Sequence, residues 1–188
     1  MGQRSQIIVL EKRVRNGKEE ISIRAVYHNQ WCYGAGFLSM LSDVLNAWDL
    51  ALKTKKKEEY FRMPTLRDTI NYCNSKEFPH LRGYYDITDE GFKDKKTIRK
   101  VFEFCDNNNG FIVLLLNGDK LSYDIVSGTE DTEKNGSITA KQYLSLFYKT
   151  DDEMIDAKIE PAEMEKILAN ISEAKRFNSF EIVLNGGD

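Results

Sequence analysis

Residues 5–27 read SQIIVLEKRVRNGKEEISIRAVY, and this stretch decides how the chain begins to fold. Two runs rich in β-branched residues, Ser5–Val14 and Glu20–Tyr27, flank the pair Asn16-Gly17. Asn and Gly tolerate positive φ, which the tight turn between two antiparallel strands requires. The sequence therefore predicts that the chain opens with an antiparallel β-hairpin.

A second pair of strands is predicted past the middle of the chain. Phe111–Leu116, FIVLLL, is a continuous apolar run, as expected of a strand that is buried on both faces. The turn residues 117–119, Asn-Gly-Asp, then lead into Leu121–Val126, which completes a second hairpin. We interpret Phe180–Leu184, FEIVL, as a closing strand.

Helical spacing of apolar residues predicts about five helices. The first carries the stripe Phe37, Leu41, Val44, Leu45, Trp48 and Leu52. Short helices are expected over residues 66–75 and 98–105, another at the capping box formed by Thr139 and Gln142, and a last one at Pro161.

Together these elements predict an α+β fold, with two β-hairpins forming a mainly antiparallel sheet packed with about five helices. We expect one domain over residues 1–188, with the acidic residues 139–188 as a candidate helical subdomain.

The segment Tyr27–Phe37, YHNQWCYGAGF, joins the first hairpin to the first helix and has two interpretations. In one it is a structural corner, in which Gly34 and Gly36 allow the turn and Trp31 packs over the junction. In the other, Trp31 is exposed as an interface anchor. The glycine pair lacks the third small residue and the βαβ unit of a dinucleotide-binding loop.

We expect neither a metal nor a cofactor. His28 and Cys32 lack the further ligands of a zinc site. Residues 131–142 place oxygen ligands as in an EF-hand loop, but Gln142 stands where calcium needs a bidentate Glu. Because local catalytic motifs are missing too, no catalytic residue is assigned and a binding protein is favoured over an enzyme. A small RNA nuclease that uses His28 or His80 is the alternative.

Charge is divided unevenly along the chain, whose net charge is -3. Residues 1–100 carry 19 Lys or Arg against 13 Asp or Glu, whereas residues 101–188 carry 8 against 17. The candidate nucleic-acid contacts are Lys55, Lys56, Lys57, Lys95, Lys96 and Lys100. The candidate partner-binding acidic patch is Asp151, Asp152, Glu153, Asp156, Glu160 and Glu163.

The sequence also bears on where the protein works. Its apolar runs are too short for a membrane span, and its N-terminus lacks the apolar core of a signal peptide. The 3 Cys are odd in number and far apart, which is typical of reduced thiols. We therefore expect a cytoplasmic protein with no membrane partner.

The opening residues 1–7, MGQRSQI, are followed by a strand, by His28-Asn29-Gln30-Trp31 and by Gly34 before a helix. Over residues 1–50 this pattern resembles small proteins of phages and other mobile elements in low-GC Gram-positive bacteria. Proteins of this size and setting include anti-CRISPR inhibitors. The resemblance implies an accessory protein that inhibits a host defence nuclease in the host cytoplasm by stoichiometric binding. The enzyme would be a type II CRISPR RNA-guided endonuclease or its guide complex. A nucleic-acid-binding module is a further alternative.

Overall fold

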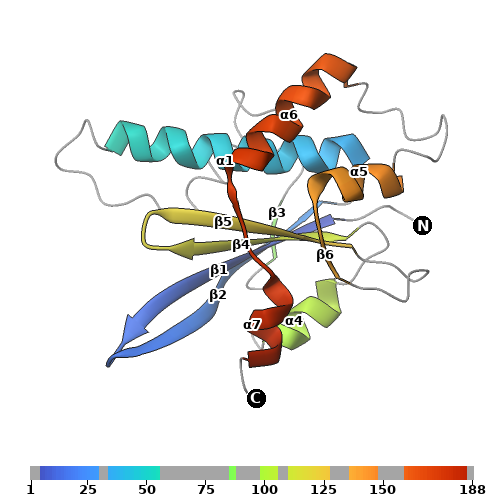
Figure 1. The fold of residues 1–188 in the computed structure, drawn as a ribbon. Coiled ribbons are helices and arrows are strands. Elements are labelled where there is room, and N and C mark those ends of the chain that lie inside the picture. Colours follow the sequence, from blue (N-terminus) through green and yellow to red (C-terminus); the bar gives the residue numbers. More distant parts are fainter. Residues whose placement is uncertain are drawn as a thin grey trace.

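The computed structural model describes residues 5–29, 34–55, 85–87, 98–105, 110–127, 136–147 and 159–185. The described residues form one mixed sheet with helices on both faces, which confirms the predicted α+β class (Figure 1). The strands are β1 (Ser5–Arg15), β2 (Lys18–Asn29), β3 (Tyr85–Asp86), β4 (Phe111–Asn117), β5 (Lys120–Val126), β6 (Ser137–Ile138) and β7 (Lys175–Arg176). The helices are α1 (Gly34–Lys55), α4 (Ile98–Cys105), α5 (Ala140–Phe147), α6 (Pro161–Glu173) and α7 (Ser179–Asn185).

The first hairpin forms as predicted. β1 and β2 pair antiparallel from Ser5 opposite Asn29 to Arg15 opposite Lys18. Asn16 and Gly17 make the turn with φ of 51° and 76°. Positive φ at both central residues matches the twist of the flanking strands, which explains why this dipeptide is used.

The sheet has the order β3-β2-β1-β4-β5-β6, and β7 pairs with β5 beside β6. β4 and β5 form the predicted second hairpin, with Asn117 opposite Lys120. The two hairpins meet through a parallel pairing of β1 with β4, which the sequence did not predict. The sheet is therefore mainly antiparallel, with parallel pairs at β1–β4 and β5–β7.

Each face of the sheet has its own apolar core. On one face, α1, α5 and α6 cover a cluster in which Phe37 stacks on Tyr143 with ring centroids 4.4 Å apart. On the other face, α4 and α7 cover a cluster in which Phe102 packs edge-on against Phe111 and Phe180. Figure 1 shows these layers, and β4 lies between them with both faces covered.

Two segments differ from the predictions. Residues 180–184, interpreted as a closing strand, lie in helix α7. Asn178 accepts the free N–H of Phe180 through its Oδ1 at 3.1 Å and so caps the start of this helix. The short strand β3, in which Tyr85 and Asp86 pair with β2, was not predicted from the sequence. The predicted helix 66–75 lies outside the described residues.

The corner before α1 is partly described. Gly34 adopts a φ of 56°, which agrees with a glycine that allows a sharp turn. Tyr27 is buried in the core on the α1 side of the sheet. Trp31 and Cys32 lie outside the described residues, so the two interpretations of Trp31 stay open.

A buried polar network ties the C-terminal segment to β5. Asp124 is fully buried, and its Oδ2 accepts the backbone N–H of Ser179 at 2.9 Å and the Ser179 hydroxyl at 2.6 Å. Its Oδ1 accepts the Ser137 hydroxyl and lies 3.8 Å from Nε of Arg176. Burial raises the pKa of the neighbouring Tyr123. The positive charge of Arg176 lowers this pKa, and the negative charge of Asp124 raises it further. One carboxylate thus joins β5, β6, β7 and α7.

Helix α5 begins at the predicted capping box. The Gln142 side chain accepts the N–H of Thr139 at 2.8 Å, and the Thr139 hydroxyl accepts the N–H of Gln142 at 3.1 Å. Gln142, the residue that spoils the EF-hand pattern, therefore has a local structural role.

Removing this cap gives a first test of the fold. Thr139→Ala leaves an N–H of the first turn unsatisfied, so we expect it to lower the free energy of unfolding by about 1 kcal/mol. Thr139→Ser keeps the hydroxyl and should stay close to wild type. Urea denaturation of the two variants checks this, and equal losses would mean that the hydroxyl does not act as a cap.

None of the helices in the described part of the chain has the length and apolar character needed to cross a membrane.

Candidate functional site

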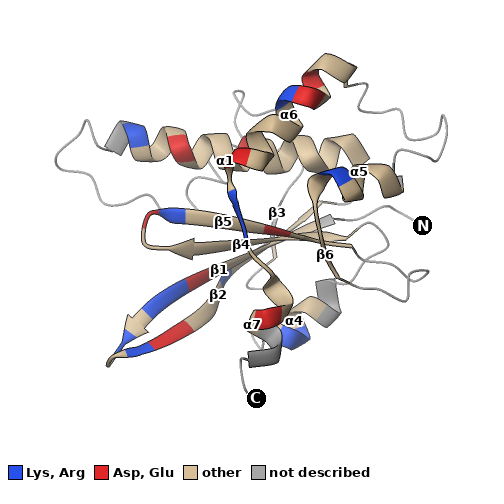
Figure 2. Cartoon of the chain, in the orientation of Figure 1, with Lys and Arg blue, Asp and Glu red and all other residues tan. Residues whose placement is uncertain are grey.

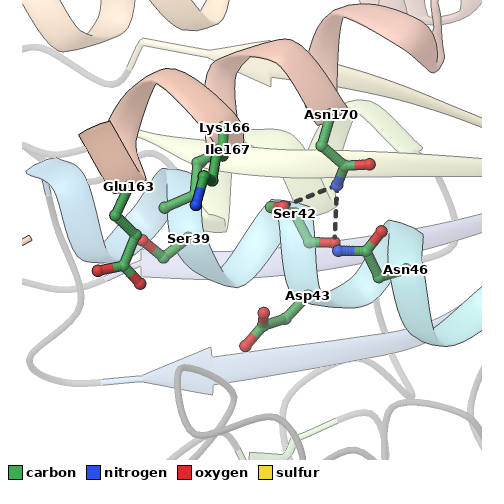
Figure 3. Close-up of a pocket in the computed structure, with 8 residues that line it drawn as sticks. All are labelled: Ser39, Ser42, Asp43, Asn46, Glu163, Lys166, Ile167 and Asn170. Carbon is green, nitrogen blue, oxygen red and sulfur yellow. Dashed lines mark hydrogen bonds between the residues drawn. The ribbon is translucent and has the colours of Figure 1, made fainter. Parts of the chain in front are cut away.

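Helices α1 and α6 enclose a groove of about 360 Å³ on the side of α1 that faces away from the sheet. Figure 3 shows its two walls. It is lined by Ser39, Ser42, Asp43 and Asn46 of α1 and by Glu163, Lys166, Ile167 and Asn170 of α6. All but Ile167 are polar or charged.

The lining follows from helical spacing. On α1 the residues stand at 39, 42, 43 and 46, and on α6 at 163, 166, 167 and 170. These are the offsets of three, four and seven that place side chains on one face of a helix. The apolar stripe of α1 next to this polar stripe packs on the sheet, while Met164, Ile167 and Ile171 of α6 are buried. The groove is therefore the polar side of the contact between α1 and α6, next to its buried apolar side.

The floor of the groove is held by hydrogen bonds. The Asn170 amide donates to the Ser42 hydroxyl at 2.7 Å and to the Ser42 carbonyl at 3.3 Å, as drawn in Figure 3. Ser39, which is buried, donates to the carbonyl of Ala35 at 2.9 Å. These bonds use the buried hydroxyls inside the protein, whereas Asn46, Glu163 and Lys166 of the lining are exposed and can be reached by a ligand.

Three charged residues line the groove: Asp43, Glu163 and Lys166. Glu163 lies in the first turn of α6, where the helix dipole favours a negative charge. Glu163 and Lys166 are exposed, and neither forms an ion pair with another described residue. Figure 2 shows that α1 and α6 both carry acidic and basic positions. The groove thus offers the carboxylate of Glu163 and the ammonium group of Lys166, and Asp43 adds a second carboxylate to its lining.

This chemistry fits a charged side chain better than an apolar small molecule. Ligand pockets of this size are lined mainly by apolar and aromatic residues, whereas here one residue of the lining is apolar. A guanidinium or ammonium group would meet the carboxylates, and Lys166 would meet an acidic or carbonyl group beside it. Within the described ranges, no three His, Cys, Asp or Glu residues are grouped so as to hold a metal ion.

The structure places two members of the predicted acidic patch. Glu163 lines the groove, and Glu160 stands just before α6, where it is exposed and its carbonyl accepts the N–H of Met164 at 3.0 Å. The other members lie outside the described residues: Asp151, Asp152, Glu153 and Asp156.

The predicted basic contacts are not gathered in the described part. Lys55 is the last residue of α1 and Lys100 is an exposed residue of α4, so these two lie on helices that cover opposite faces of the sheet. Lys56, Lys57, Lys95 and Lys96 lie outside the described residues, as does Trp31.

The nuclease alternative named two histidines. His28 is in β2, half-buried, with its Nδ1 3.2 Å from the amide nitrogen of Gln6. Cys32 and His80 lie outside the described residues, so no catalytic pair involving His28 is placed.

Of the residues that line the groove, only Glu163 was predicted from the sequence as a binding residue. The signal was present as a polar stripe, with Ser39, Ser42, Asp43 and Asn46 at the same helical spacing as the apolar stripe beside it. A helix with a polar stripe that includes two serines is usually taken to face solvent, and only the position of α6 shows that the serines are covered.

Comparisons with protein-family models, with curated proteins and with solved structures found no match for this chain.

Proposed function

We propose that this chain inhibits a host defence nuclease by binding it stoichiometrically in the host cytoplasm, and that the first target is a type II CRISPR RNA-guided endonuclease. The resemblance of residues 1–50 to proteins of phages and mobile elements suggests this class of target. The α1–α6 groove supports a binding role, because it presents the exposed charges of Glu163 and Lys166, which have no ion-pair partner among the described residues.

Glu163 carries the proposal. Its carboxylate is exposed at the groove and has no ion-pair partner among the described residues. A nuclease that holds nucleic acid has a surface of Lys and Arg, and such a side chain complements this groove. Charge pairs at an accessible interface contribute mainly to association rate and specificity, so the acidic groove would select a basic partner.

The test is cleavage of target DNA by a fixed amount of the endonuclease with increasing amounts of this protein. We expect cleavage to fall to a plateau near one equivalent of the wild-type chain. Glu163→Lys should raise the concentration needed for half inhibition at least about tenfold, since a tenfold change corresponds to 1.4 kcal/mol. Glu165→Lys makes the same charge change on the same helix outside the groove lining, and it should inhibit like wild type.

Guide RNA incubated with the protein and run on a gel separates the alternatives. Intact guide together with stoichiometric inhibition supports binding. A guide that is shortened by catalytic amounts of the protein would replace the proposal with the nuclease. Equal inhibition by Glu163→Lys and wild type would remove the groove as the binding site, and full cleavage at all concentrations would remove this endonuclease as the target.

A further inference from the structure

The outer half of the first hairpin projects beyond the sheet (Figure 1). β4 pairs with β1 only over residues 6–12, and β3 pairs with β2 only at Tyr27 and His28. Among the described strands, none pairs with residues 19–25 of β2 on the side away from β1. This stretch, here called the β2 edge, presents a row of backbone groups of the kind that pairs with another strand.

The turn geometry determines which backbone groups of the β2 edge point outward. In a two-residue turn of this type, Arg15 and Lys18 form the hydrogen-bonded pair that closes the hairpin. Hydrogen-bonded and non-hydrogen-bonded positions alternate along an antiparallel pair, so the N–H and C=O groups of Glu19, Ile21 and Ile23 point away from β1. At the register shift between Val9 and Leu10, β2 contains one extra residue. Beyond it, the residues whose backbone groups point away from β1 are therefore the even-numbered ones. In agreement, the carbonyl of Val26 points outward and accepts the N–H of Ile87 at 2.9 Å.

The side chains of the β2 edge divide into a charged face and an apolar face. Glu20, Ser22 and Arg24 share the face of Glu11, because Ser22 stands opposite Glu11 and Arg24 donates a hydrogen bond from Nε to Glu11. Ile21 and Ile23 lie on the other face, partly buried against the cluster under α4 and α7.

Arg24 keeps capacity for a second acid. Burial raises the pKa of Glu11, but the hydrogen bonds and charges of Arg13 and Arg24 outweigh this effect and hold it below its usual value. Arg24 is engaged there through Nε, and its guanidinium carries further N–H donors on the terminal nitrogens. Its side chain is 41% exposed, so these donors can be reached from outside.

We propose that a second copy of this chain pairs antiparallel along the β2 edge, with Ser22 of each copy on the two-fold axis. In this register Glu20 stands opposite Arg24 of the other copy, and symmetry makes the pair twice. Ile21 and Ile23 face each other in the same way, so the apolar faces also continue across the interface. The sheets of the two copies then form one continuous sheet.

Other registers along the same edge are poorer. An axis at Ile21 places Lys18 opposite Arg24, and an axis at Glu20 places the two Glu20 side chains opposite each other; like charges in these positions are destabilising. With the two-fold axis at Ile23, the pairing between copies would extend to residues of β2 that already pair with β3. An axis between two residues would match outward-facing with inward-facing backbone groups and break the ladder. The charges therefore select the register centred on Ser22.

The dimer should be weak and reversible. The ladder is limited to residues 19–25, because the turn ends it on one side and β3 on the other. Interfaces below about 1,200 Å² are typical of transient complexes. The test is therefore the molar mass of the full chain over a concentration series, by sedimentation equilibrium.

We expect the wild-type mass to rise with concentration from 21.7 kDa toward twice that value. Glu20→Arg alone and Arg24→Glu alone place like charges in both cross-pairs, so each should stay at the mass of one chain. An equimolar mixture of the two variants has opposite charges in both cross-pairs, and it should dimerise again. Glu165→Arg changes the charge by the same amount on α6, outside the β2 edge, and should dimerise like wild type.

Loss of the Arg24–Glu11 contact in the charge variants would also give a monomer if it unfolded the hairpin. A backbone variant that keeps this contact tests the dimer independently. Ile21→Pro removes an N–H that points away from β1, so the hairpin keeps its own ladder while the dimer loses a hydrogen bond. We expect a monomer with a wild-type circular dichroism spectrum. A wild-type chain that stays at one-chain mass throughout would overturn the proposal. So would a dimer that Glu20→Arg, Arg24→Glu and Ile21→Pro leave unchanged.

Discussion

Asp124→Ala is expected to lower the free energy of unfolding by about 3–5 kcal/mol, because it removes the acceptor of several hydrogen bonds and each buried donor left unsatisfied costs about 1–3 kcal/mol. The variant leaves the hydroxyls of Ser137 and Ser179 and the N–H of Ser179 without their shared acceptor. Ser179 is fully buried, so water does not replace the lost bonds at that end of the network. Because small domains are stable by about 5–15 kcal/mol in total, this change should bring the protein close to unfolding at body temperature.

Two further variants separate the charge from the shape. Asp124→Asn keeps one oxygen that can accept but loses the negative charge near Arg176, so its loss should be smaller. Ser122→Ala lies two residues away on β5 and on the same face, and it should cost well under half as much as Asp124→Ala. Urea denaturation followed by far-ultraviolet circular dichroism gives the three values. If Asp124→Ala unfolds with the midpoint of wild type, the carboxylate does not hold the C-terminal segment.

The parts of the fold that follow from local sequence were predictable. Asn16-Gly17 determined the first hairpin, because its two positive φ angles are a property of the dipeptide itself. The capping box and Pro161 marked two helix starts for the same reason. The apolar stripe of α1 gave both the helix and the face that it buries. In each case the interacting residues are neighbours in the sequence.

Other parts depend on contacts between distant residues and were missed. The parallel register of β1 with β4 has no local signal, since the paired residues Ile7 and Ile112 are far apart in the sequence. The apolar run 180–184 suits a strand or a short helix equally, and the choice is made by the caps at its start.

The same dependence on distant contacts explains why Asp124 and most of the α1–α6 groove were not predicted. Asp124 was not singled out from the sequence, because its partner Ser179 is 55 residues away. Apart from Glu163, the α1–α6 groove was not predicted, because its two polar stripes become a site only when the helices meet.

Trp48→Ala should produce the second large loss, about 3–5 kcal/mol, as expected for deleting a buried aromatic side chain. Trp48 is 2% exposed in the core under α1. Its indole Nε1 donates to the carbonyl of Asp119 at 3.0 Å, which fastens α1 to the turn between β4 and β5. This single residue therefore joins the first helix to the second hairpin, 71 residues further along the chain.

Trp48→Phe separates the two contributions, because it keeps an aromatic ring and most of the apolar volume but removes the indole N–H. The hydrogen bond to Asp119 should account for about 1 kcal/mol, and the rest of the loss in Trp48→Ala is packing. Urea denaturation of both variants gives the division. If they lose equal stability, the hydrogen bond outweighs the packing and α1 is held at the turn rather than by its apolar stripe.

The same variant answers the question about Trp31, since the chain has only 2 Trp. In Trp48→Phe, the remaining tryptophan fluorescence comes from Trp31 alone. Blue-shifted emission that is protected from iodide quenching would place Trp31 in a buried corner between the first hairpin and α1. Red-shifted, readily quenched emission would make it an exposed aromatic anchor. An exposed Trp31 would be a candidate contact for a partner that the α1–α6 groove selects by charge.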